Sequence, residues 1–86
     1  MSAPKILMYA SPWCGYCARA RTLLGEKGVA VEEIDVDAMP GAREEMLARS
    51  GGCGTVPQIF IGDKHIGGAD ELEELDAAGR LDTMLK

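Results

Sequence analysis

The chain has 86 residues and a formal net charge of −5, and 47% of its residues are hydrophobic and 27% charged. This length and ordinary composition predict one small globular domain spanning residues 1–86. The acidic balance argues against general binding of nucleic acid or anionic membranes. Since no apolar run approaches the ~18 residues of a membrane helix and the first residues lack a signal-peptide core, we expect a soluble, cytoplasmic protein.

The cysteines narrow the function further. The sequence has three cysteines, and such a low, odd number does not suggest a secreted disulfide framework. Cys14 and Cys17 form a Cys-x-x-Cys pair, and Cys53 stands alone in a glycine-rich loop. A structural zinc site normally needs four ligands, and only Cys53 and His65 are left to join the pair. We therefore expect a catalytic pair rather than a structural metal site.

The first half of the chain predicts a strand, a helix and a second strand. The apolar run of residues 6–9 is typical of a strand buried on both faces. After a proline-containing break, a helical pattern runs from Cys17 to a natural stop at Gly28. Residues 29–36 then carry the apolar positions of another strand, with imperfect alternation.

The second half predicts a helix, a hairpin and further helix. Residues 42–49 form a helical pattern with Met46 and Leu47 pointing inward. Residues 56–61 indicate a strand that begins next to a proline, which suits the edge of a sheet. A turn at residues 62–64 leads to a short return strand.

The end of the chain predicts a helix over residues 70–78, with Asp70 as its N-cap, and a last helical turn over residues 81–85. The resulting order is strand, helix, strand, helix, strand, strand, helix. This order predicts an α/β fold in which a small mixed sheet is covered by helices.

The Cys-x-x-Cys pair is placed for redox chemistry. The reactive form of cysteine is the thiolate, and the unpaired N–H groups at a helix start favour negative charge. Cys14 would lie at that start and Cys17 one turn inside, which predicts that Cys14 attacks and Cys17 resolves. Two cysteines that merely pack are the alternative. Tyr16 is expected to border the site, and Trp13 to lie on its rim.

Two later segments contain groups that suit a ligand. Thr55, Val56 and Pro57 start the predicted edge strand, whose free backbone groups could pair with an extended peptide. Gly67 and Gly68 let a ligand approach the backbone closely. The helix start after them could bind a carboxylate, while capping alone is the alternative role for Asp70.

These three segments together resemble the glutaredoxin family. The motif Cys-Gly-Tyr-Cys at residues 14–17 is similar to its dithiol active site. Residues 55–62 are similar to its Thr-Val-Pro segment, residues 65–72 to its Gly-Gly segment, and residues 75–82 to the bacterial branch. The resemblance implies a thioredoxin-like fold with a four-stranded mixed sheet flanked by helices, a cis peptide before Pro57, and glutathione as co-substrate.

The resemblance also implies a set of glutathione contacts. The cysteine backbone of glutathione would pair with Val56, its γ-glutamyl carboxylate would meet the N–H groups of Ala69 and Asp70, and its glycine carboxylate would need Arg43. The implied glutathione-binding residues are Tyr16, Arg43, Thr55, Val56, Pro57, Gly68, Ala69 and Asp70.

The sequence departs from the family pattern at several places. Gly15 replaces the typical active-site proline, and Ser11 stands where many members carry a lysine that faces glutathione. The loss of this lysine leaves Arg43 more responsible for the ligand. Ala69 replaces a common cysteine or serine. The loop before Thr55 is one residue longer, and we expect its Cys53 to fill space, with approach to the active site or oxidation as the alternatives.

Two functions follow from the resemblance, and a third from the similarity of residues 13–15 to the start of the thioredoxin site. The first is a monomeric, glutathione-dependent thiol–disulfide oxidoreductase that reduces protein–glutathione mixed disulfides and protein disulfides. The second is an iron–sulfur carrier in which a 2Fe-2S cluster bridges a dimer through two Cys14 thiolates and two glutathione thiols, a role that Gly15 keeps open. The third is a redoxin that depends on thioredoxin reductase and ignores glutathione.

Overall fold

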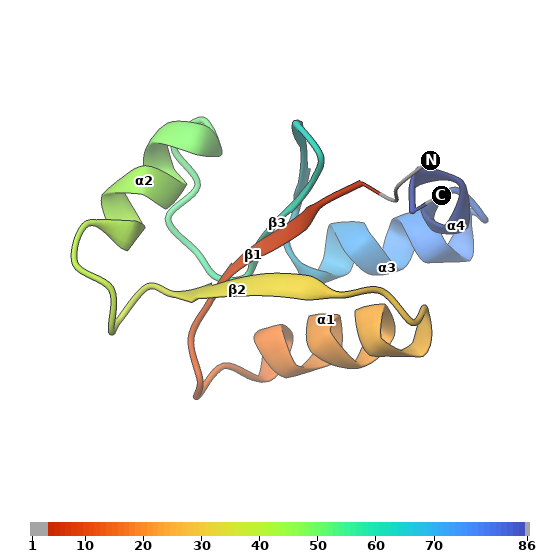
Figure 1. Cartoon of the computed structure of the whole chain (residues 1–86), viewed down its shortest axis with the longest axis horizontal. Helices are drawn as coiled ribbons and strands as arrows, with labels where there is room; N and C mark the ends of the chain where they lie inside the picture. Colours follow the sequence, from red (N-terminus) through yellow and green to blue (C-terminus); the bar gives the residue numbers. More distant parts are fainter. Residues whose placement is uncertain (1–3, 86) are drawn as a thin grey trace.

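A four-stranded mixed sheet forms the centre of the computed structural model, which describes residues 4–85 (Figure 1). The strands lie in the order β2-β1-β3-β4. β1 pairs in parallel with β2 and antiparallel with β3, and β3 pairs antiparallel with β4. The strand bounds are β1 Ile6–Ala10, β2 Val31–Asp35, β3 Gln58–Ile61 and β4 Lys64–Gly67. The predicted four-stranded mixed sheet flanked by helices is confirmed.

Helices cover both faces of this sheet. The ribbon shows α1 and α3 on one face and α2 on the other (Figure 1). Since β1 and β2 are parallel, the chain must cross over between them, and α1 makes that crossover. The helix bounds are α1 Gly15–Glu26, α2 Ala42–Arg49, α3 Ala69–Ala77 and α4 Leu81–Met84.

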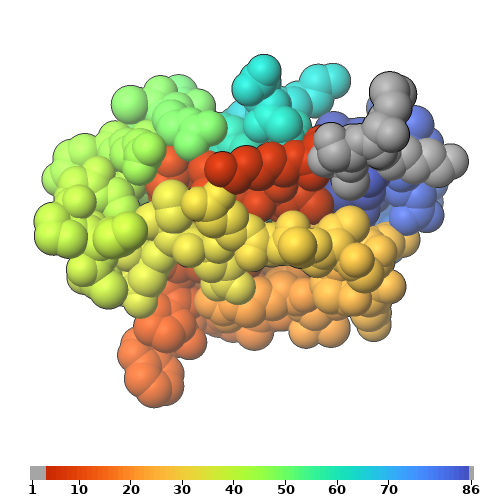
Figure 2. All heavy atoms as spheres, viewed as in Figure 1, coloured from red at the N-terminus to blue at the C-terminus, as the bar shows by residue number. Residues whose placement is uncertain are grey.

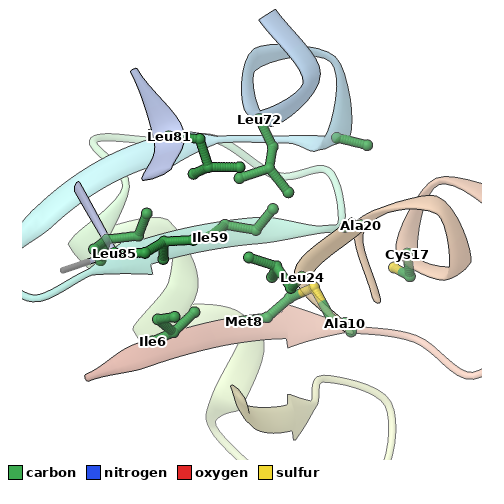
Figure 3. Close-up of a cluster of buried hydrophobic side chains, with 12 residues drawn as sticks. Ile6, Met8, Ala10, Cys17, Ala20, Leu24, Ile59, Leu72, Leu81 and Leu85 are labelled. Atoms are coloured by element: carbon green, nitrogen blue, oxygen red, sulfur yellow. The ribbon is translucent and has the colours of Figure 1, made fainter. Parts of the chain in front are cut away.

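The alternation of side chains along β1 and β3 divides the core into two clusters. On one face, Met8 and Ile59 pack with Leu24 of α1 and Leu72 of α3 (Figure 3). On the other face, Tyr9 and other side chains of the sheet pack with Met46 of α2. All five residues of β1 are buried, as predicted for a strand covered on both faces. This central strand leads straight into the cysteine pair.

Three of the sequence predictions are wrong. Residues 56–61 do not form an edge strand, because β3 begins at Gln58 and lies between β1 and β4. Asp70 is not the N-cap of α3; Gly68 is, and Asp70 lies in the first turn. Leu47 does not point into the core and is 37% exposed, since only Ala42 and Met46 of α2 are buried.

The other elements follow the predictions closely. α2 spans residues 42–49 as predicted, and α1 begins at Gly15, directly after Cys14, as the predicted place of the cysteine pair at a helix start requires. Gly28 has a left-handed φ of 71° after the C-cap of α1, which is the conformation of a helix stop. Within residues 4–85, no helix is both long enough and apolar enough to cross a membrane.

Candidate active site

Cys14 lies at the N-terminus of α1. It is the N-cap residue, with extended backbone angles (φ −104°, ψ 122°), and its carbonyl accepts the first helical hydrogen bond from Ala18 at 3.1 Å. The short loop from the end of β1 to Cys14 projects from the body of the molecule, at the lower left of Figure 2. Cys14 itself is partly exposed, so its sulfur is open to reagents and to the N–H groups of the first turn.

The surroundings of Cys14 favour its thiolate. Burial acts to raise its pKa, but the N–H groups of Cys17 and Tyr16, the Cys17 thiol and the charge of Arg21 outweigh that effect. The net result is a Cys14 pKa below the ordinary value. Donors at a helix start lower thiol pKa values in this way. A Cys14 thiolate is therefore available for nucleophilic attack.

Cys17 is the opposite case. Its side chain is fully buried, at 0% exposure. Burial raises the pKa of its thiol, and the nearby Cys14 sulfur adds to the increase through its hydrogen bond and charge. The Ser11 backbone and Arg21 oppose the increase without cancelling it. The two sulfurs are thus unequal in the direction that the sequence predicts, with Cys14 the more acidic and accessible one.

The Thr55–Pro57 segment lies against the first cysteine. The Sγ of Cys14 is 3.7 Å from the carbonyl oxygen of Val56. The Val56–Pro57 peptide bond is cis, as the resemblance implies. Thr55 is exposed, Val56 is partly buried and Pro57 is buried. Because Val56 precedes β3, this part of its backbone stays outside the sheet ladder.

The start of α3 completes the cluster of segments. Gly67 has a φ of +114°, and a Cβ placed on Gly68 would lie 3.4 Å from the carbonyl oxygen of Pro57. This contact places the Gly-Gly segment directly beside the Pro57 segment. The Gly68 N–H donates to the Glu71 carboxylate at 2.7 Å. The later N–H groups of the helix start remain suited to a second carboxylate.

Arg43 and Ser11 meet at one acidic side chain. Arg43 Nη2 lies 3.0 Å from Asp37 Oδ1, and the Ser11 hydroxyl donates to Asp37 Oδ2 at 3.0 Å. Arg43 also reaches the Gly54 carbonyl at 3.5 Å, next to Thr55. Arg43 therefore lies near the predicted binding segment, but its charge is shared with Asp37.

The aromatic residues near the cysteines are on the surface. Trp13 is 93% exposed and Tyr16 is 56% exposed. The Arg19 guanidinium lies 5.5 Å from the centre of the Tyr16 ring and also pairs with Glu73 and, at 3.6 Å, with Asp70. Arg19 thus connects the border of the cysteine pair with the start of α3.

Sequence reasoning missed Asp37 and Glu71. Glu71 has a sequence signal, because a glutamate three residues after an N-cap is the second half of a capping box, but the sequence predicts the N-cap at Asp70, two residues after its place at Gly68. Asp37 gives no comparable signal, since its role depends on two partners elsewhere in the chain, Arg43 of α2 and Ser11 of the loop after β1. Cys53 packs locally against Ser50 through hydrogen bonds of its N–H and Sγ.

Among residues 4–85, no three His, Cys, Asp or Glu side chains are grouped for a metal ion.

This fold and site define a class. A Cys-x-x-Cys pair at a helix start, flanked by the Val56 loop and the Gly-Gly segment on a four-stranded mixed sheet, is a thiol–disulfide oxidoreductase site on a thioredoxin-like fold. The family model described as Glutaredoxin matches residues 6–66. The chain belongs to the glutaredoxin family, whose members are glutathione-dependent thiol oxidoreductases.

Known relatives agree with this assignment. The chain is 50% identical over 82 residues to a glutaredoxin of Pseudomonas aeruginosa, covering 95% of this chain and 96% of the relative. It is 52% identical over 79 residues to glutaredoxin 3 of Escherichia coli, covering 92% and 94%. The crystal structure of a buckwheat glutaredoxin–glutathione complex superposes with a TM-score of 0.86 at 34% identity, over 96% of this chain and 76% of that one.

Proposed function

We propose that this glutaredoxin uses glutathione to reduce protein–glutathione mixed disulfides and protein disulfides. The observation that carries the proposal is the inequality of the two sulfurs. Cys14 is partly exposed, has a lowered pKa and lies beside a free backbone segment, while Cys17 is buried and has a raised pKa. A nucleophile and a resolving thiol need these two environments.

Deglutathionylation requires Cys14 alone. Its thiolate attacks the glutathione sulfur of a mixed disulfide, a new S–S bond forms, and the bond to the protein sulfur breaks. The protein leaves as a thiolate that takes a proton from solvent. A second glutathione, as thiolate, then attacks the glutathione sulfur held on Cys14. Oxidised glutathione leaves, and the Cys14 thiolate is restored.

Protein disulfides require both cysteines. Cys14 attacks one sulfur of the disulfide and releases the first protein thiol. Cys17 then loses its proton and attacks the Cys14 sulfur, which releases the second protein thiol and leaves a Cys14–Cys17 disulfide. Two glutathione molecules reduce this bond and become oxidised glutathione. Exchange potentials of roughly −200 to −230 mV in such proteins, close to the cytosolic glutathione poise, permit both directions.

We assign the glutathione-binding site to three segments that lie together: the cysteine pair, residues 55–57 and the start of α3. The backbone of Val56 would pair with the cysteine of glutathione, beside Cys14. The helix start at Ala69 and Asp70 would bind the γ-glutamyl carboxylate. The buckwheat relative solved as a glutathione complex supports this assignment. The other proposed glutathione-binding residues are Tyr16, Arg43, Thr55, Pro57 and Gly68.

Two single variants test the roles of the cysteines. With a glutathionylated protein as substrate and glutathione-coupled turnover as readout, Cys14→Ser should abolish activity. Cys17→Ser should keep deglutathionylation and lose the reduction of protein disulfides. Activity in Cys14→Ser would overturn the assignment. Parallel assays with glutathione and with thioredoxin reductase separate this function from a redoxin that ignores glutathione.

A second candidate function rests on Gly15. A Cβ at this exposed position would have no neighbour within 4 Å, so the backbone beside the Cys14 sulfur is unobstructed. A thiolate is the usual ligand of an iron–sulfur cluster. Because residues 4–85 offer no set of three ligands, the other ligands of a 2Fe-2S cluster would be glutathione thiols and the Cys14 of a second copy. A protein that stays colourless after anaerobic reconstitution with iron, sulfide and glutathione would refute this function.

A further inference from the structure

The buried amide of Gln58 connects the Thr55–Pro57 segment to β4. Gln58 is 3% exposed, although it is the first residue of its strand. Its Nε2 lies 2.9 Å from the Thr55 carbonyl oxygen and 3.4 Å from the Thr55 hydroxyl. Its Oε1 lies 2.7 Å from Nε2 of His65 on β4. Both ends of one buried side chain are therefore bonded.

The chemistry of the partners fixes the direction of each bond. A backbone carbonyl can only accept, so the Gln58 group that faces Thr55 must be its NH₂. The Gln58 oxygen then faces His65, and the Nε2 of His65 must carry the proton. His65 also lies against the Phe60 ring, 5.0 Å between ring centres, which holds the imidazole from the side.

The peptide plane transmits this anchoring to Val56. The Thr55 carbonyl and the Val56 N–H belong to the same peptide group, which is planar and, unlike the next bond, trans. In a trans peptide these two groups point in opposite directions. When Gln58 holds the Thr55 carbonyl on the inner side, the Val56 N–H must point away from Gln58.

We propose that Gln58 is a positioning residue for the peptide-like part of the substrate, with His65 as its anchor on the edge strand. It fixes the orientation of the N–H of Val56, the residue whose carbonyl oxygen lies 3.7 Å from Cys14 Sγ, and so presents a ready donor to the backbone of the bound thiol. The inference rests on the proposed function, because the ligand is the glutathione moiety of a mixed disulfide. A hydrogen-bonded bridge through the buried Gln58 amide preorganises the segment before the ligand arrives.

The test uses Gln58→Met, which keeps the length of the side chain and removes both hydrogen bonds. With a glutathionylated peptide as substrate, KM should rise about tenfold, a change of about 1.4 kcal/mol, while kcat stays within about twofold. The alkylation rate of Cys14 by iodoacetamide should not change, because this small reagent makes no use of the Val56 N–H.

Two controls separate positioning from general stability. Ile59→Val weakens the neighbouring residue of the same strand, on the opposite face, without touching Thr55. It should lower the midpoint of thermal unfolding and leave KM unchanged. His65→Leu should raise KM in the same direction as Gln58→Met, and His65→Gln, which keeps a donor, should restore it toward the wild-type value.

The outcomes are distinct. An unchanged KM in Gln58→Met, or a rise in KM that Ile59→Val reproduces at equal loss of thermal stability, would overturn the positioning role while the proposed function stands. A wild-type protein without glutathione-coupled turnover would overturn both. A selective rise in KM with unchanged Cys14 alkylation supports the role of Gln58.

Discussion

The two active-site cysteines show how position in a helix sets the chemistry of a residue. Both are thiols in the same turn, and one lies at the cap while the other faces the core. Donors stabilise the first as a thiolate, and burial keeps the second protonated. Backbone N–H groups, the Cys17 thiol and Arg21 lower the pKa of Cys14, while burial is the largest cause of the raised pKa of Cys17.

This difference predicts separate pH profiles. A thiol with a lowered pKa remains a thiolate at lower pH, so the alkylation rate of Cys14 should have its midpoint at a lower pH than that of a free cysteine. Cys17 has a raised pKa and should react only at higher pH, and slowly. Iodoacetamide labelling followed by mass spectrometry as a function of pH measures both profiles.

Arg21 tests the cause of the lowered Cys14 pKa, and Arg19 of the same helix is the matched control. Arg21 contributes to the lowered pKa of Cys14, whereas Arg19 does not. Arg21→Gln should move the Cys14 midpoint upward, and Arg19→Gln should leave it in place. Equal shifts in the two variants would show that charge in general, rather than the position of Arg21, sets the reactivity.

Asp37 limits the charge that Arg43 can offer to a ligand. It pairs with Arg43 and also accepts the Ser11 hydroxyl. The exposed pair is worth little to stability, but if Arg43 binds glutathione as proposed, Asp37 would compete with the ligand carboxylate. We expect Asp37→Asn to lower the KM for glutathione about two- to threefold, since exposed ion pairs are of that strength.

Two controls check the Asp37 prediction: the ionic strength and a distant ion pair, Lys5–Glu32. The effect should shrink at high ionic strength, because salt screens exposed charges. Glu32→Gln breaks another exposed pair, with Lys5, and should leave KM unchanged. If Asp37→Asn raises KM, Asp37 organises Arg43 rather than competing with the ligand.

At the scale of elements, the start of α3 depends on one glycine. Gly67 has a φ of +114°, and an added Cβ would lie 2.8 Å from the Glu71 carboxylate oxygen. Gly67→Ala therefore meets both backbone strain and a clash with the capping side chain. We expect a loss of roughly 1–3 kcal/mol in the free energy of unfolding, together with weaker glutathione binding, measured by urea titration and calorimetry.

Gly79 provides the matched comparison for Gly67. It also has a positive φ, +74°, but an added Cβ would have no neighbour within 4 Å. Gly79→Ala should cost only the backbone term, roughly 1 kcal/mol, and leave glutathione affinity unchanged. A Gly67→Ala variant as stable as Gly79→Ala would show that Glu71 moves aside without cost.

At the scale of the whole molecule, the sequence predicts those structural features that are determined by residues close together in the chain. The span of α2, the hairpin turn and the burial of β1 follow from local pattern. The central place of β3 does not, because strand order is decided by pairing between distant segments. The exposure of Leu47 and the loss of Asp70 as a cap likewise depend on how α2 and α3 rest on the sheet.

The same division holds for the candidate site. The cysteine pair and its inequality follow from spacing and helix physics. The contact between Cys14 and Val56 and the closeness of Pro57 to Gly68 arise only when the sheet brings separate loops together. The family resemblance supplies which loops to compare. It gives no indication of the Asp37 pair or the Gln58 bridge, which depend on how separate segments of the fold come together.

The exposed indole of Trp13 gives the molecule an optical reporter. Trp13 is the single tryptophan of the sequence, is 93% exposed and directly precedes Cys14. Its emission in the reduced protein should be that of a water-exposed indole. A disulfide quencher formed at Cys14, or a peptide bound over the loop, would change that emission at once. Each half-reaction is therefore observable by stopped-flow fluorescence without any attached label.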